Sequence, residues 1–137
     1  MVFNNAVGFT IGHPVDHIYY QGEIVEFVGV VTNIGNHYSL TNFTFTCPEK
    51  AMYMFSVSIA SDYYKFDSEV AIMRDEEDLI HAWLDGSQSI LMYGSASAVL
   101  VTECDVGQSV WVKTITNAYV DGDFKASHFS GALIQRL

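Results

Sequence analysis

The sequence has few basic residues, only two prolines and two cysteines, and no apolar run long enough to cross a membrane. Sixteen acidic residues against six lysines and arginines give a formal net charge of −10 over 137 residues. A surface of that sign repels phosphate groups, but it is compatible with metal ions, cationic ligands and neutral sugars. We therefore expect no nucleic-acid partner and no membrane insertion.

The sequence also lacks a visible secretion signal, a Gly-X-Y repeat and any low-complexity segment. Residues 1–5 have neither the basic region nor the apolar region of a signal peptide, which fits a cytosolic chain or one whose leader was removed. The two cysteines, Cys47 and Cys104, define no disulfide framework. Either they pair, or each is a small buried hydrophobe.

Apolar and aromatic residues are plentiful: half of the chain is hydrophobic and 14% is aromatic. This composition predicts a packed core, and the length predicts one domain spanning residues 1–137. The most informative stretch is residues 24–55. There β-branched residues predict a strand, residues 33–36 predict a turn, residues 43–46 alternate as a half-buried strand does, and Pro48 ends that strand.

Similar patterns predict short strands along the whole chain. Residues 79–84 follow an acidic run, as in a helix start, but their strand-like neighbours favour a strand and a loop. Eight to ten short strands without a convincing helix predict a sandwich or barrel. The strands are expected at residues 7–11, 24–33, 42–47, 52–62, 69–73, 87–103, 109–116 and 128–137.

Two patterns resemble metal sites, and each also has an ordinary structural interpretation, as has an acidic run. His13, Asp16 and His17 have a ligand-like spacing, but Pro14 prevents a shared helical face, so a loop is favoured over zinc. The segment Asp121-Gly122-Asp123 lacks the regular oxygen series of an EF-hand, which favours a turn. The acidic run at residues 75–78 is typical of a solvated face.

No motif for catalysis is present, neither a Gly-x-Ser-x-Gly elbow nor a glycine-rich phosphate loop. Ser127 and His128 are neighbours on a predicted strand, so their side chains point to opposite faces and form no dyad. Cys47 has no activating base nearby in the sequence, and a structural role is favoured for it. We expect no enzyme activity.

A predicted loop carries three aromatic residues, Tyr63, Tyr64 and Phe66. Aromatic rings are costly to leave in water, so they either fold back on a sheet or form a contact surface. We treat them as candidate ligand contacts.

Three blocks of this sequence resemble one protein family in order and spacing. They are Phe27-x-x-Val30-x-Thr32-Asn33-x-Gly35-x-x-Tyr38 with Phe45-Thr46-Cys47-Pro48 and Tyr53-x-Phe55; Gly107-x-x-Val110-Trp111-Val112; and Ser127-x-Phe129-Ser130-Gly131-x-Leu133. The chain thus resembles the globular-head domain of complement C1q, within the tumour necrosis factor-like superfamily. The family usually has glycine at the positions of Phe43 and Ala51, so the bends there are expected to differ in shape.

The resemblance implies an all-β, ten-stranded jelly-roll sandwich of two antiparallel sheets that assembles as a trimer. Family members are mostly secreted recognition heads on a stalk. The resemblance further implies that the strand ends carrying Cys47 and Cys104 lie far apart, so both cysteines are expected to be unpaired. Some members bind calcium near the trimer apex. Asp85 lies near one such ligand position, but the other falls on Gly94, which has no side-chain oxygen and argues against calcium.

The sequence and the resemblance favour a secreted, lectin-like recognition module of innate-immune type, with carbohydrate or protein surface ligands. The alternatives are a cytokine-like receptor ligand and a structural trimerisation head. Asn42-Phe43-Thr44 is a glycosylation sequon at the entry to a strand and is expected to be accessible. The expected ligand contacts are Tyr63, Tyr64, Phe66, Asp121 and Asp123.

Overall fold

The computed structural model describes residues 5–15, 18–61, 67–85, 94–121 and 126–137, which form twelve strands. In chain order the strands are β1 (Gly8–Pro14), β2 (Ile18–Tyr19), β3 (Phe27–Ile34), β4 (Tyr38–Ser39), β5 (Thr44–Thr46), β6 (Ala51–Ser61), β7 (Ser68–Arg74), β8 (Glu77–Leu84), β9 (Gly94–Cys104), β10 (Ser109–Thr114), β11 (Ala118–Tyr119) and β12 (His128–Arg136).

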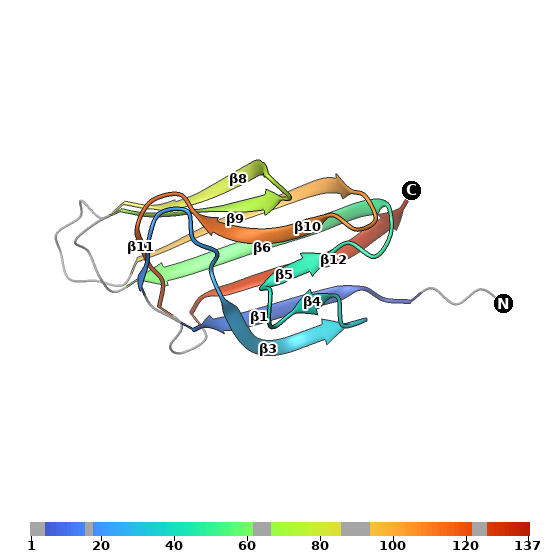
Figure 1. The fold of residues 1–137 in the computed structure, drawn as a ribbon, viewed down its shortest axis with the longest axis horizontal. Coiled ribbons are helices and arrows are strands. Elements are labelled where there is room, and N and C mark those ends of the chain that lie inside the picture. The colour runs from blue at the N-terminus through green and yellow to red at the C-terminus, as the bar shows by residue number, and fades with distance from the viewer. Residues whose placement is uncertain (1–4, 16–17, 62–66, 86–93, 122–125) are drawn as a thin grey trace.

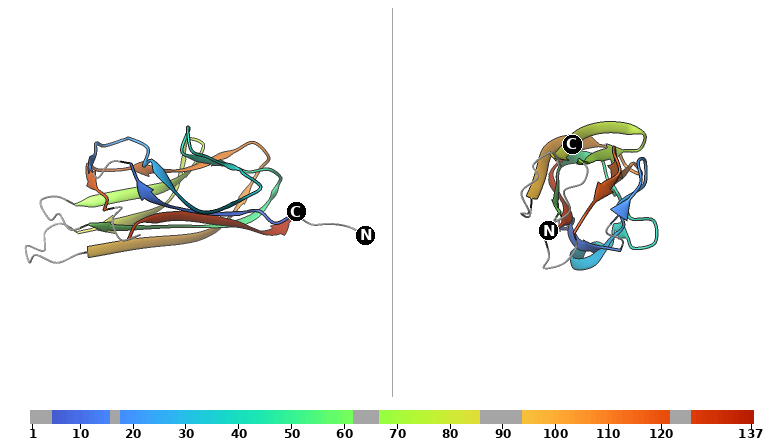
Figure 2. Two further views of the ribbon diagram at one scale, coloured as in Figure 1. Left: turned by 90° about the horizontal axis from the view of Figure 1, so that it is seen from below. Right: turned by 90° about the vertical axis from the view of Figure 1, so that its left-hand side faces the viewer.

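The strands build two five-stranded sheets and one two-stranded ribbon, and every pairing is antiparallel (Figure 1). The first sheet has the order β3-β1-β12-β6-β9, the second has the order β4-β5-β10-β7-β8, and β11 pairs with β2. Figure 2 shows the two sheets as stacked layers. The described segments contain no helix, hence none long and apolar enough to span a membrane. The predicted sandwich of two antiparallel sheets is confirmed.

The core lies between the two sheets and is rich in aromatic rings. Alternation along each strand sends every second side chain inward, so Phe9 of the first sheet stacks on Phe45 of the second with ring centroids 4.7 Å apart. Phe129 meets Phe9 edge-on at 4.9 Å. On β12, Gly131 leaves room for two rings, because a Cβ there would lie 2.6 Å from atoms of Phe9 and Phe55.

The turn after β3 has the backbone geometry that its residues predict. Gly35 and Asn36 have φ angles of 87° and 59°, and the Asn36 amide donates to the Asn33 carbonyl at 3.1 Å. Phe43, where the family usually has glycine, has a φ of 61°. The backbone therefore makes a left-handed bend at this position despite the side chain.

Residues 77–84 settle the choice between helix and strand. They form β8, which pairs with β7 so that Glu69 lies opposite Trp83 and Ala71 lies opposite His81. Ala82 faces the core, whereas Trp83 is exposed. The acidic residues before this segment belong to the turn between β7 and β8 and not to the first turn of a helix.

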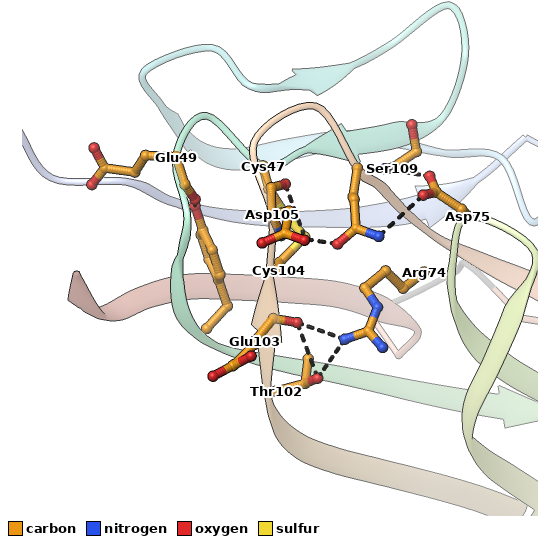
Figure 3. The surroundings of a disulfide bond; sticks show 11 residues. Cys47, Glu49, Arg74, Asp75, Thr102, Glu103, Cys104, Asp105 and Ser109 are labelled. Atoms are coloured by element: carbon orange, nitrogen blue, oxygen red, sulfur yellow. Dashed lines mark hydrogen bonds between the residues drawn. A yellow bond between two sulfur atoms is a disulfide. The ribbon is translucent and has the colours of Figure 1, made fainter. Parts of the chain in front are cut away.

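The prediction of unpaired cysteines is wrong, because Cys47 and Cys104 form a disulfide (Figure 3). The corner at residues 48–50 leads from Cys47 straight to Ala51, the first residue of β6, and Ala51 pairs with Cys104 at the end of β9. The two Cα atoms are therefore only 6.3 Å apart, within the range that a disulfide can bridge. The bond joins the chain beyond β5 of the second sheet to β9 of the first.

Arg74 makes a second connection between the sheets beside the disulfide (Figure 3). Its guanidinium donates to the Thr102 hydroxyl at 2.8 Å and to the Glu103 carbonyl at 2.6 Å, and it also pairs with Glu77. The edges of the two sheets are thus held by one covalent bond and by one charged side chain.

Candidate functional site

The outer face of the first sheet carries large apolar side chains that the protomer leaves in solvent. Met54 on β6 and Val101 on β9 lie opposite each other, and their exposed fractions are 44% and 55%. Val99, two residues along β9 on the same face, is 57% exposed. The inward neighbours of these residues are in the core, so alternation alone places the three side chains on the outside.

Small hydroxyl residues occupy much of the rest of this face, and four of them are paired within the protomer. Ser58 accepts a hydrogen bond from Ser97 at 3.0 Å across β6 and β9. Thr10 and Ser130 share a hydrogen bond of 2.9 Å across β1 and β12. Their hydroxyl groups therefore already have partners before any contact with another molecule is made.

Charge is nearly absent from this face. We define the first-sheet outer face by the residues that the register places with Met54 and Val101, and among them only Glu103 and His128 can ionise. Its members include Gly8, Thr10, Gly12, Thr32, Ile34, Met52, Met54, Ser56, Ser58, Ala60, Ser95, Ser97, Val99, Val101, Glu103, His128, Ser130, Ala132 and Gln135. In a chain of net charge −10, a face with so little charge is suited to contact another protein.

The structure describes only one of the five predicted ligand contacts. Tyr63, Tyr64, Phe66 and Asp123 lie outside the described residues. Asp121 is described and is 5% exposed, so little of this residue is open to solvent in the protomer. Its backbone is also engaged, since the amide donates to the Ala60 carbonyl at 2.7 Å.

Asp85, the candidate calcium ligand, directly follows β8 and is half-buried. The described residues contain no group of three or more His, Cys, Asp or Glu side chains that could hold a metal ion. At Gly94 a Cβ would lie 2.7 Å from a Leu84 methyl carbon, so a side chain there would displace Leu84. Of the zinc pattern, His13 is exposed on β1, and Asp16 and His17 fall outside the described segments.

Asn42 is exposed in the turn between β4 and β5, at the edge of the second sheet. Its backbone amide donates to the Ser39 hydroxyl at 3.0 Å, which fixes the turn. The first-sheet outer face belongs to the other layer, so a group attached to Asn42 would not lie on that face.

One cluster was missed by the sequence interpretation. On the outer face of the second sheet, the His81 ring lies between two carboxylates: one ring nitrogen bonds to Glu69 of β7, and the other bonds to Asp78 of β8 at 2.5 Å. The acidic run supplies Asp78, but Glu69 comes from another strand. Only the register of β7 against β8 reveals this cluster.

The two carboxylates give a prediction about pH. The hydrogen bond to Asp78, and then that to Glu69, raise the pKa of His81 above 6.5, although burial opposes the shift. Because the folded pKa lies above the unfolded value, the stabilisation that protonated His81 gives the fold is fully present below about pH 6.5 and is lost as the pH rises through the folded pKa.

An NMR titration of the His81 ring should show the raised pKa. Asp78→Asn should lower it and Glu23→Gln should not, whereas an unshifted titration in the parent would contradict the arrangement.

Comparisons with known proteins agree with this architecture. A family model described as the C1q domain matches residues 8–134, which is most of the chain. Caprin-2 of Danio rerio is 29% identical over 104 residues, which is 75% of this chain and 11% of that protein. The chain thus spans about a tenth of that relative's length.

Solved structures show the same fold at low sequence identity. The globular domain of zebrafish complement 1qA protein has a TM-score of 0.75 at 16% identity, over 96% of this chain and 99% of that one. The Eiger TNF of S. frugiperda has a TM-score of 0.77 at 7% identity, over 98% and 96% of the two chains. Murine APRIL at pH 8.0 has a TM-score of 0.73 at 12% identity, over 96% and 100%. The jelly roll expected from the sequence is confirmed.

Proposed function

Because the chain belongs to the C1q domain family, we propose that it is a secreted recognition module that works as a homotrimer. The observation that carries this proposal is the first-sheet outer face, with its exposed Met54, Val99 and Val101 and its almost complete lack of charge. Apolar patches of this kind are typical of protein–protein contacts.

Electrostatics favours the same face for self-association. Three chains of −10 repel one another wherever their acidic surfaces approach, so they associate where charge is lowest. In a closed three-fold ring the first-sheet outer face of each protomer faces the axis. The second sheet, with Asn42 at its edge, then faces solvent.

The disulfide supports secretion, because such bonds form and persist in oxidising compartments. In the secretory pathway an N-linked glycan would be attached at Asn42, which is exposed and lies within a sequon. We place recognition of microbial surfaces, glycans or proteins in loops that include Tyr63, Tyr64, Phe66 and Asp123. Aromatic rings suit the apolar face of a sugar, and a carboxylate orients its hydroxyl groups.

Light scattering together with a glycan array tests the proposal. We expect a mass of about 46 kDa, three chains of 15.3 kDa, and glycan binding that Tyr64→Ala weakens without changing the mass. A 15.3 kDa particle at micromolar concentration would refute the trimer. If Tyr64→Ala bound every identified ligand like the parent, these loops would not be the binding site. The site would then be expected in the grooves between subunits, as in a cytokine-like receptor ligand. A trimer without any ligand would be a structural head.

A further inference from the structure

The outer face of the second sheet carries an exposed tryptophan beside a carboxylate. Trp83 on β8 is 56% exposed, and it lies opposite Glu69 of β7 on the same face. Side chains opposite each other in an antiparallel pair have Cβ atoms about 5 Å apart. A largely exposed indole thus lies beside a carboxylate whose side chain is 24% exposed.

This pair continues into the His81 cluster. Glu69 of β7 bonds to the His81 ring, and the ring bonds to Asp78, so Trp83, His81 and Asp78 of β8 and Glu69 of β7 form one continuous group across the two strands. The ring bridges the two carboxylates and does not converge with them on one point, in keeping with the lack of a metal-ligating group among the described residues.

The segment that carries Trp83 is strongly acidic. Residues 67–85 hold seven acidic residues against one arginine, which is far more acidic than the rest of the chain. That arginine, Arg74, is engaged with Glu77, Thr102 and the Glu103 carbonyl. The seven acidic residues are Asp67, Glu69, Asp75, Glu76, Glu77, Asp78 and Asp85.

A run of acidic residues alone is typical of an ordinary solvated surface. An exposed tryptophan beside those residues is not, because its large apolar ring is left in water. We propose that Trp83, Glu69 and Asp78 form a docking surface for a basic segment of a partner protein. An arginine of that segment stacks on Trp83 and pairs with Glu69, and a second basic residue reaches Asp78. A guanidinium suits this surface because it stacks on an aromatic face and also binds a carboxylate. Charge complementarity selects this partner over an anionic one.

His81 links this docking to pH. The charged groups that face it on the second sheet are Glu69 from β7 and Asp78 from β8, and Lys113 of β10 lies opposite Ala71, one strand further away. On the neighbouring β9, Glu103 is the ionisable residue. Protonated His81 neutralises the two carboxylates that the arginines need. Basic partners therefore bind more weakly when His81 is protonated, and binding in turn favours its neutral form.

The test uses the whole chain and a fluorescein-labelled peptide, Gly-Arg-Gly-Gly-Arg-Gly, with binding measured by fluorescence anisotropy. We expect Trp83→Ala and Glu69→Gln each to weaken binding about fivefold or more. Glu23→Gln, a matched loss of one exposed charge in the loop before β3, should change binding by less than about twofold. The same peptide with citrulline in place of arginine should not bind. Circular dichroism confirms that each variant is folded.

Acidification from about pH 8 to about pH 5.5 should weaken binding in the parent but not in His81→Gln. An arginine peptide that binds equally well to Trp83→Ala overturns the proposal. So does a neutral oligosaccharide that binds at Trp83 when the arginine peptide does not. Because the surface is on the second sheet, the assay gives the same answer for a monomer and for a trimer, and its failure is distinct from a failure of the trimer.

Discussion

Reduction of the Cys47–Cys104 disulfide is expected to lower the free energy of unfolding by about 4 kcal/mol. The bond closes a long loop, since the two cysteines are 57 positions apart, and opening it returns that conformational freedom to the unfolded chain. Both cysteines are fully buried between the sheets, so the loss of the bond also exposes an edge of the core. A loss of this size is a large part of the stability of an ordinary domain.

Urea unfolding with and without reductant measures this effect on one and the same sequence. Protein concentration is kept equal in the two arms, because association would shift the transition. A double variant, Cys47→Ala with Cys104→Ala, should unfold like the reduced parent or earlier. The denatured, unreduced parent should show no thiol that labels. Equal midpoints for the oxidised and reduced protein, or two labelled thiols, would refute the pairing.

Val101→Asp is expected to convert the proposed trimer into monomers. Val101 lies on the first-sheet outer face, on the edge strand β9 and opposite Met54 of β6, so the proposed interface would bury one aspartate of each protomer without a partner. Each unpaired charge costs several kcal/mol to bury, more than such an interface can lose. Light scattering should show the mass fall from about 46 kDa to the 15.3 kDa of one chain.

The chain offers a matched control for that substitution. Val106 is 69% exposed in the turn between β9 and β10, outside the first-sheet outer face. Val106→Asp makes the same chemical change and should leave three chains together. A trimer that survives Val101→Asp would place the contact on another surface, and dissociation by Val106→Asp would mean that net charge decides assembly.

Local patterns predicted most of the strands, because alternation between a core face and an outer face is recorded in neighbouring residues. The strand predicted at residues 52–62 is β6 (Ala51–Ser61), and that at residues 109–116 is β10 (Ser109–Thr114). The two-residue strands β2, β4 and β11 were not predicted, since two residues are too short to show a period.

The features that the sequence did not predict depend on pairing between distant strands. The disulfide follows from Ala51 lying opposite Cys104, and the His81 cluster follows from the register of β7 against β8. Neither register can be read from local alternation. The burial of Asp121 has a related cause: the Asp121 amide donates to the carbonyl of Ala60 on β6, and the Asp121 carbonyl accepts from the hydroxyl of Ser127.

The close packing around Gly131 restricts which residues can occur on three adjacent strands. A Cβ at this position would lie 2.6 Å from atoms of the Phe9 and Phe55 rings, which come from the strands on either side of β12. A side chain at 131 therefore requires smaller residues at both 9 and 55. Across a set of relatives, the sizes of the three residues are expected to covary, and a chain carrying only one of the changes would be removed by selection.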